Sequence, residues 1–174
     1  MKRKLIHRLK IGGIVVLSTL CLAAVAINHR RWQDPEKILQ EFYDYGVEHG
    51  AAEDMLMDPL ILAGSRVVPL IIKEVGNVDM PKRRYAIGFL GNGGYREAIP
   101  VLKKIIDDEH DNQNCRGDAL ISLYRIDKDV AQIFIKEHNL RSDYLGYIAG
   151  KLTEDPNRMI YERSFFKALI GYHD

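Results

Sequence analysis

The densest group of chemically versatile side chains is the run Asp-Asp-Glu-His-Asp at residues 107–111. Carboxylate oxygens are the ligands that calcium and similar hard cations prefer, but this run lacks the fixed positions and the turn glycine of an EF-hand loop. Acidic runs that follow an apolar helix are usually solvated, or they pair with a nearby arginine, which here is Arg116. We therefore predict a solvated or arginine-paired turn that binds no metal.

A second polar group combines Glu48 and His49 with Glu53 and Asp54. Residues four apart share a helix face, so His49 and Glu53 would meet on a continuous helix. Gly50 lies between them and favours a helix break instead. We expect no ligand site in this group.

Three further side chains, Cys115, His138 and His173, could act as a nucleophile or as ligands. Cys115 occupies an apolar position of a predicted helix, where a free cysteine behaves as a small hydrophobic residue. The two histidines have no partner at ligand spacing, so we expect both at the surface. The chain also contains no His-Glu-x-x-His and no Gly-x-Ser-x-Gly sequence. We predict no catalytic residue, no cofactor and no metal, and a protein that is not an enzyme.

The glycine-rich stretch Gly91-Asn92-Gly93-Gly94 suggests a phosphate-binding loop at first sight. A Walker loop, however, follows a strand and ends in Gly-Lys followed by Ser or Thr. Here Tyr95-Arg96-Glu97 follows, and the preceding segment has the apolar spacing of a helix. Glycine also permits the positive φ that ends a helix in a tight turn. We predict a hinge between two packed helices.

The elements that position these residues have the pattern of helices from residue 33 onward. Asp34-Pro35 and Asp58-Pro59 each combine an N-cap residue with proline in the first turn. Gly50 and Gly76 are placed to end helices, and Ser65 is placed to cap one. We find no alternating strand pattern bounded by hairpin turns, so the predicted fold class is all-α.

The sequence also repeats itself at intervals in the low thirties. One set of residues recurs after 33 positions and another after 31. The recurring sets are Arg83, Ala86 and Leu90 with Arg116, Ala119 and Leu123, and Val68–Ile71 with Ile99–Leu102. A period of this length with two helices in each unit predicts a short α-solenoid, in which neighbouring helical hairpins stack to close a core.

The repeat unit resembles the HEAT-like repeat of the phycobilisome-lyase type. The resemblance is strong over residues 65–126 and weaker to about residue 140. It rests on Arg83, Ala86, Leu90-Gly91, Gly94, Ala98-Ile99-Pro100, Leu102 and Asp107-Asp108. It implies a stack of helical hairpins, and it is specific for the fold but not for an activity.

The amino-terminal 27 residues have the pattern of a membrane-targeting segment. Residues 1–10 contain five Lys or Arg residues and no acid, and residues 11–27 are uncharged. As a helix this run would span about 25 Å, close to the ~30 Å hydrocarbon core of a bilayer. The basic end stays cytoplasmic by the positive-inside rule, so we expect a single-pass membrane protein whose body is exported.

Two interpretations of this segment remain open. An uncleaved signal anchor fits the long apolar run, whereas Ala24-Val25-Ala26 fits a cleavage site that would release a secreted or periplasmic protein. A lipoprotein would need a small residue before Cys21, where Leu20 stands. Trp32 suits either the membrane interface or packing under the first helix.

The sequence thus predicts four segments. They are a basic stub with an anchor or signal helix (1–29), amino-terminal capping helices (30–64), HEAT-like repeats (65–140) and carboxy-terminal capping helices (141–174). Of the 25 basic residues, 20 remain after residue 10 against 24 acids, which gives the rest of the chain a net charge of −4. An acidic body argues against nucleic acid as a partner.

We predict a non-enzymatic, membrane-tethered scaffold that binds a protein. The second helix of each hairpin is expected to line the concave side, so its lysines are candidate partner contacts. These candidates are Lys73, Lys103, Lys104 and Lys136. A merely solvated face is the alternative. Two other functions stay open, namely an enzyme accessory or lyase-like repeat protein, and an auxiliary subunit whose apolar helix contacts a membrane complex.

Overall fold

The computed structural model describes residues 33–46, 50–138, 140, 143–159 and 162–173. These residues form helices and turns and include no strand, which confirms the all-α prediction for this part of the chain. Residues 34–174 make one compact unit. The predicted anchor or signal helix, Trp32 and the pair Glu48-His49 lie outside the described residues.

The helices are short and closely spaced. In chain order they are α2 (Pro35–Asp44), α3 (Asp58–Ala63), α4 (Val68–Glu74), α5 (Arg83–Asn92), α6 (Ile99–Asp107), α7 (Gln113–Ile126), α8 (Lys128–Glu137), α9 (Asp143–Glu154), α10 (Pro156–Met159) and α11 (Phe165–Ile170). Three 3₁₀ turns, η1 (Glu53–Met55), η2 (Gly64–Val67) and η3 (Arg96–Ala98), precede α3, α4 and α6.

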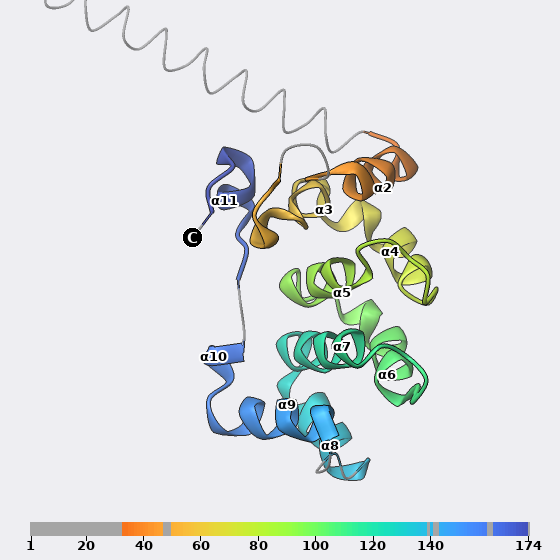
Figure 1. Cartoon of the computed structure of the whole chain (residues 1–174), viewed down its shortest axis with the longest axis vertical. Helices are drawn as coiled ribbons and strands as arrows, with labels where there is room; N and C mark the ends of the chain where they lie inside the picture. The colour runs from red at the N-terminus through yellow and green to blue at the C-terminus, as the bar shows by residue number, and fades with distance from the viewer. Residues whose placement is uncertain (1–32, 47–49, 139, 141–142, 160–161, 174) are drawn as a thin grey trace, which may run out of the picture. The chain divides into compact units, whose positions relative to one another are not determined.

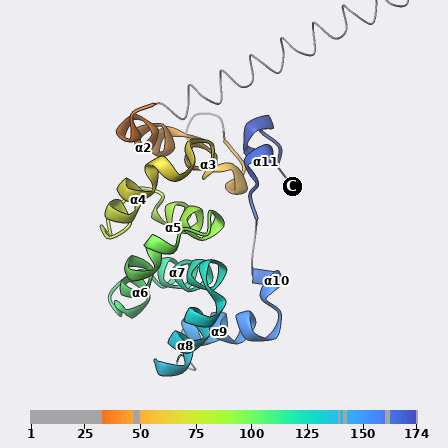
Figure 2. The ribbon, with the colours of Figure 1, turned by 180° about the vertical axis from the view of Figure 1, so that it is seen from behind.

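The helices lie in two rows, as Figures 1 and 2 show. The helices α3, α5, α7 and α9 follow one another in one row, and we call them the first helices. The helices α4, α6 and α8 lie beside them, and we call them the second helices. The central helix α7 packs against α5, α6, α8 and α9. At one end α3 packs against both α2 and α11, so the last helix lies beside the start of the unit.

One apolar core runs through the unit. Leu60, Ile71, Leu90, Leu102 and Leu123 come from five successive α-helices, and none has exposed surface. Burial of each such side chain stabilises the fold by roughly 1.5–3 kcal/mol relative to an exposed position. These side chains belong to one core cluster that joins neighbouring helices.

Capping residues set several helix starts. Asp34 accepts a hydrogen bond from the backbone nitrogen of Glu36, which confirms the predicted cap of α2. Asn112 caps α7 in the same way, and Asp127 caps α8 through the nitrogen of Val130. Each cap satisfies a backbone donor that the first helical turn leaves unpaired.

Three predicted boundary residues act differently. The helix α2 ends before Gly46, whose φ is 81°, so the prediction that Gly50 ends it is wrong. Ser65 lies inside η2, and α4 has no side-chain cap, so its predicted capping role is also wrong. Asp58 is the first residue of α3, and its carboxylate does not cap that helix.

Arg83 and Arg116, which lie 33 residues apart, make equivalent contacts. The Nε of Arg83 donates to the carbonyl of Val75 at 2.7 Å, and the Nε of Arg116 donates to the carbonyl of Ile106 at 2.9 Å. These carbonyls lie at the ends of α4 and α6, where helices leave carbonyl groups without an intrahelical partner. The 33-residue recurrence in the sequence is therefore also a recurrence of contacts.

Hydrogen bonds between residues far apart in the sequence join α5 to α7. Residues 33–35 positions apart make three such hydrogen bonds. They run from Arg84 to Asp118 (2.6 Å), from the Ser122 hydroxyl to the Ile87 carbonyl (3.0 Å) and from Arg125 to Asn92 (2.9 Å).

The glycine-rich stretch begins in the last turn of α5, with Gly91 and Asn92, and continues into the turn before η3. Gly94 has a φ of 66°, and the nitrogen of Tyr95 donates to the carbonyl of Leu90 at 3.2 Å, which confirms the predicted hinge. Gly91 has a second role that the sequence did not indicate. A Cβ added there would lie 2.6 Å from the Cα of Ser122, so α5 and α7 approach too closely for a larger residue.

Candidate functional site

The structure gives the acidic run at 107–111 a role in packing. Asp111 is buried and receives two hydrogen bonds from Arg83, of 2.6 and 2.7 Å. Pairing with an arginine was predicted, but the expected partner, Arg116, was wrong because that side chain binds the Ile106 carbonyl. Arg83 is the first residue of α5, and its Nε also binds the Val75 carbonyl at the end of α4. The Arg83–Asp111 pair thus fixes the turn before α7.

The other candidate ligands are also dispersed. Among the described residues, no three His, Cys, Asp or Glu side chains gather as a possible metal site. His138 is exposed, as predicted, and its Nε2 lies 3.4 Å from a carboxylate oxygen of Asp107. Cys115 is 7% exposed and belongs to the core, as predicted. Burial raises the pKa of its thiol, so the reactive thiolate is disfavoured.

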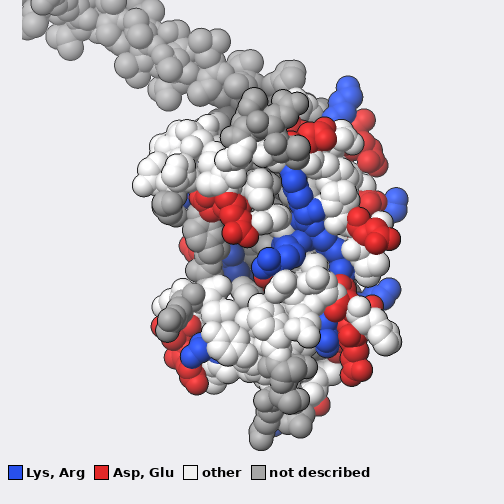
Figure 3. All heavy atoms as spheres, in the orientation of Figure 1, with Lys and Arg blue, Asp and Glu red and all other residues white. Residues whose placement is uncertain are grey.

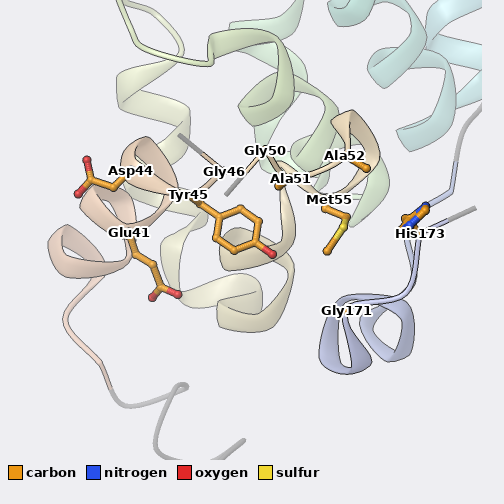
Figure 4. A pocket seen from close by; sticks show the side chains of 10 residues that line it. All are labelled: Glu41, Asp44, Tyr45, Gly46, Gly50, Ala51, Ala52, Met55, Gly171 and His173. Carbon is orange, nitrogen blue, oxygen red and sulfur yellow. The ribbon is translucent and has the colours of Figure 1, made fainter. Parts of the chain in front are cut away.

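A hollow of about 910 Å³ opens where α2, η1 and the carboxy-terminal residues meet (Figure 4). Glu41, Asp44 and Tyr45 line one side, and Met55 and His173 line another. Figure 4 shows both carboxylates on the far side of Tyr45 from His173. Acid–base catalysis needs groups within hydrogen-bond reach of one reacting atom. Figure 4 shows that these side chains do not converge in that way.

The predicted partner-binding lysines all lie on second helices: Lys73 on α4, Lys103 and Lys104 on α6, and Lys136 on α8. The side chain of Lys73 is 79% exposed, and Lys104 and Lys136 are exposed too. Lys103 is partly buried, with its Nζ 5.4 Å from the ring centroid of Phe134 on α8. Lys103 therefore covers a ring between α6 and α8, and the other three lysines face solvent.

Basic side chains form a band on the face drawn in Figure 3, and acidic side chains border it. Two basic residues at the start of α5 are engaged within the fold. Lys82 donates to the carbonyls of Phe42 and Tyr45, and Arg84 pairs with Asp118. These cations contribute to helix packing, so they are poor candidates for a ligand site.

The carboxy-terminal segment contributes a polar site that sequence reasoning missed. Arg163 is 1% exposed. Its guanidinium donates two hydrogen bonds, of 2.7 and 2.6 Å, to the carboxylate of Asp58. The same guanidinium lies 3.1 Å from a carboxylate oxygen of Asp54. The side-chain amide of Asn92 accepts from the Arg163 nitrogen at 3.0 Å and donates to its carbonyl at 2.7 Å. We call Asp54, Asp58, Asn92 and Arg163 the carboxy-terminal clasp.

The clasp could not be found from local pattern. Arg163 and Asp58 are 105 residues apart, and Asp58 precedes a proline, so it has the pattern of an ordinary N-cap. The one local signal is the spacing of Asp54 and Asp58, which places two carboxylates near one helix start. The clasp shows that this unit can hold an extended segment by pairing with its backbone and enclosing an arginine.

The described residues thus offer contact surfaces, a wide hollow and a clasp filled by the chain itself. Their buried side-chain polar atoms have hydrogen-bond partners. A smaller hollow of about 160 Å³ beside α5 and α7 is lined by Arg84, Tyr85, Asp118 and Arg125, and Arg84 pairs there with Asp118. A comparison with known proteins found that no protein family, no curated protein and no solved structure matches the chain.

Proposed function

We propose that residues 34–174 form a short α-solenoid of HEAT-like hairpins that binds another protein. The observation that carries this proposal is the repetition of contacts. Arg83 and Arg116 each bind the end of a preceding second helix, and side chains about one repeat apart join α5 to α7. Stacked repeats of this kind contact only their neighbours and leave extended surfaces for partners.

The second helices supply the proposed binding surface. Lys73, Lys104 and Lys136 are exposed on α4, α6 and α8. Lys103 is assigned to positioning α6 against α8 because it covers Phe134. A partner segment with acidic side chains fits this row, since complementary charge favours the correct encounter and register.

The proposal also places the body outside the cytoplasm, held by residues 11–27 as a signal anchor. Its support is the sequence pattern of a basic stub followed by 17 uncharged residues. Among the described residues, Glu53–Glu74 is also long and apolar enough to cross a membrane. Half of that stretch is buried within the unit, and Gly64 interrupts it with a φ of 70°. We assign its apolar character to the core.

The intact mass of the chain recovered from cells tests the anchor. We expect the full 19.9 kDa in the membrane fraction. A mass lacking about residues 1–26 would show cleavage after Ala24-Val25-Ala26. That result would refute the signal anchor. It would not bear on the proposed binding surface, which has its own test.

Co-purification from solubilised membranes tests the binding surface. The variant Lys73→Glu/Lys104→Glu/Lys136→Glu reverses three exposed charges and touches no core residue. We expect recovery of the partner to fall roughly tenfold or more, because like charges placed together across an interface cost several kcal/mol. Lys37→Glu, on the exposed side of α2, is the matched control and should leave recovery unchanged. Equal recovery with the triple variant would refute this surface.

A further inference from the structure

Helix α11 leaves a large apolar surface open at the end of the unit. It buries Ala168 against the core. Four side chains of α11 and one just after it are apolar and exposed, and we call them the α11 face. They are Phe165, Phe166, Leu169, Ile170 and Tyr172. Phe166 alone is 66% exposed. Residues four apart lie one above the other on a helix, so Phe165 with Leu169 and Phe166 with Ile170 form two adjacent rows. Exposed patches of this kind mark interaction sites.

The α11 face is held outward by the clasp. Ser164 caps the start of α11, and Gly171, with a φ of 64°, ends it. Arg163 directly precedes Ser164, and its guanidinium donates to the carbonyl of Tyr172, which lies beyond the carboxy-terminal end of α11. The same guanidinium also binds Asp58 of α3. The helix α11 packs on α3 as well. The apolar side chains therefore cannot turn inward unless these contacts break.

The same end of the unit carries the covalent link to the apolar run at 11–27. The helices α2 and α11 both pack on α3, and Figures 1 and 2 show them on either side of it. Six residues, 28–33, separate the apolar run from Asp34. A chain of six residues spans at most about 20 Å. An anchored chain therefore keeps Asp34, just before α2, within about 20 Å of the end of the apolar run.

We propose that the α11 face docks on the surface of the lipid bilayer, as a second contact beside the anchor. This inference rests on the proposed signal anchor. Phe, Leu and Ile side chains suit the boundary between headgroups and acyl chains, and Tyr suits the headgroup level. Asp34 and Glu36 are acidic residues at the same end, and Lys167 is a cation on α11. The contact is therefore apolar, and it does not require anionic lipids.

Fluorescence quenching in vesicles tests this contact on the full chain. The sequence has one tryptophan, Trp32, which Trp32→Phe removes. In that background Phe166→Trp reports on the α11 face, and Ile133→Trp is the matched control. Ile133 is 57% exposed on α8, which lies at the far end of the unit from α2 and α11 (Figure 1). Both chains are reconstituted into phosphatidylcholine vesicles with brominated acyl chains.

We expect the Phe166→Trp chain to lose roughly half of its fluorescence or more, because interfacial helices bury their apolar face about 5–10 Å into the headgroup and acyl boundary. The Ile133→Trp chain should keep its fluorescence, and high salt should change neither result. An unquenched Phe166→Trp signal in chains that stay with the vesicles would overturn the docking. A blue-shifted but unquenched signal would assign the face to a second copy of the chain, and would also overturn it. Intact chains that separate from the vesicles would refute the anchor itself, and with it the reason for placing α11 at a bilayer.

Discussion

At the scale of single residues, Arg83 and Asp111 depend on each other. Their side chains are 5% and 3% exposed. Removal of one partner from a buried ion pair leaves the other charge uncompensated, which costs about 3–5 kcal/mol. We predict that Arg83→Ala lowers the free energy of unfolding by that amount, as measured by urea denaturation. Lys104→Ala, at an exposed position of α6, should stay within ~0.5 kcal/mol of the unaltered chain. A similarly small loss for Arg83→Ala would contradict the buried pair.

Gly91 supplies a second residue-scale prediction because it sets how closely α5 approaches α7. A Cβ there would lie 2.6 Å from the backbone of Ser122. We predict that Gly91→Ala destabilises the fold by about 1–3 kcal/mol, as overpacking does. Gly150→Ala in α9 is the control, since a Cβ there meets nothing within 4 Å. The control should gain up to ~1 kcal/mol from helix propensity. Equal thermal and urea stabilities for the two variants would show that the close approach is absent.

At the scale of elements, the clasp holds α11, the last helix, against α3. Arg163 is buried with Asp58, so Arg163→Ala leaves a carboxylate without its cation. We predict that residues 162–173 then exchange amide hydrogens about 100-fold faster, the equivalent of ~3 kcal/mol. The amides of α5 and α7 should keep their protection. Glu162→Ala, an exposed neighbour in the same segment, is the control. Unchanged exchange in the Arg163→Ala chain would mean that other contacts hold α11.

The starts of helices could be predicted because the signals are local. Proline lies in the first turn of α2, α3, α4 and α6, where its fixed φ suits the helix and its missing donor is not needed. Helix ends were less predictable, since α2 ends before Gly46 and not at Gly50. Asp58 shows the physical reason for such errors. A residue with the pattern of a cap is bound instead by Arg163, and no local rule contains that contact.

At the scale of the molecule, the 33-residue spacing of Arg83 and Arg116 in the sequence recurs in the contacts that these two arginines make with the ends of α4 and α6. The spacing of residues in the sequence could not predict where the last helix, α11, packs. Residues 141–174 were expected to cap the carboxy-terminal end. The helix α9 packs on α7, but α11 packs on α3 at the opposite end. This contact between distant parts of the chain depends on the clasp and on the buried Ala168 of α11.

Site-specific photo-crosslinking in intact membranes tests the central claim, that the second helices bind a partner protein. A photoreactive residue is placed in turn at Lys73, Lys104 and Lys136. Gly150 on α9 serves as the control, because it is exposed and a side chain there meets nothing. The account predicts one common cross-linked partner from all three second-helix positions and none from Gly150. Cross-links from Gly150 with none from the three lysine positions would contradict it.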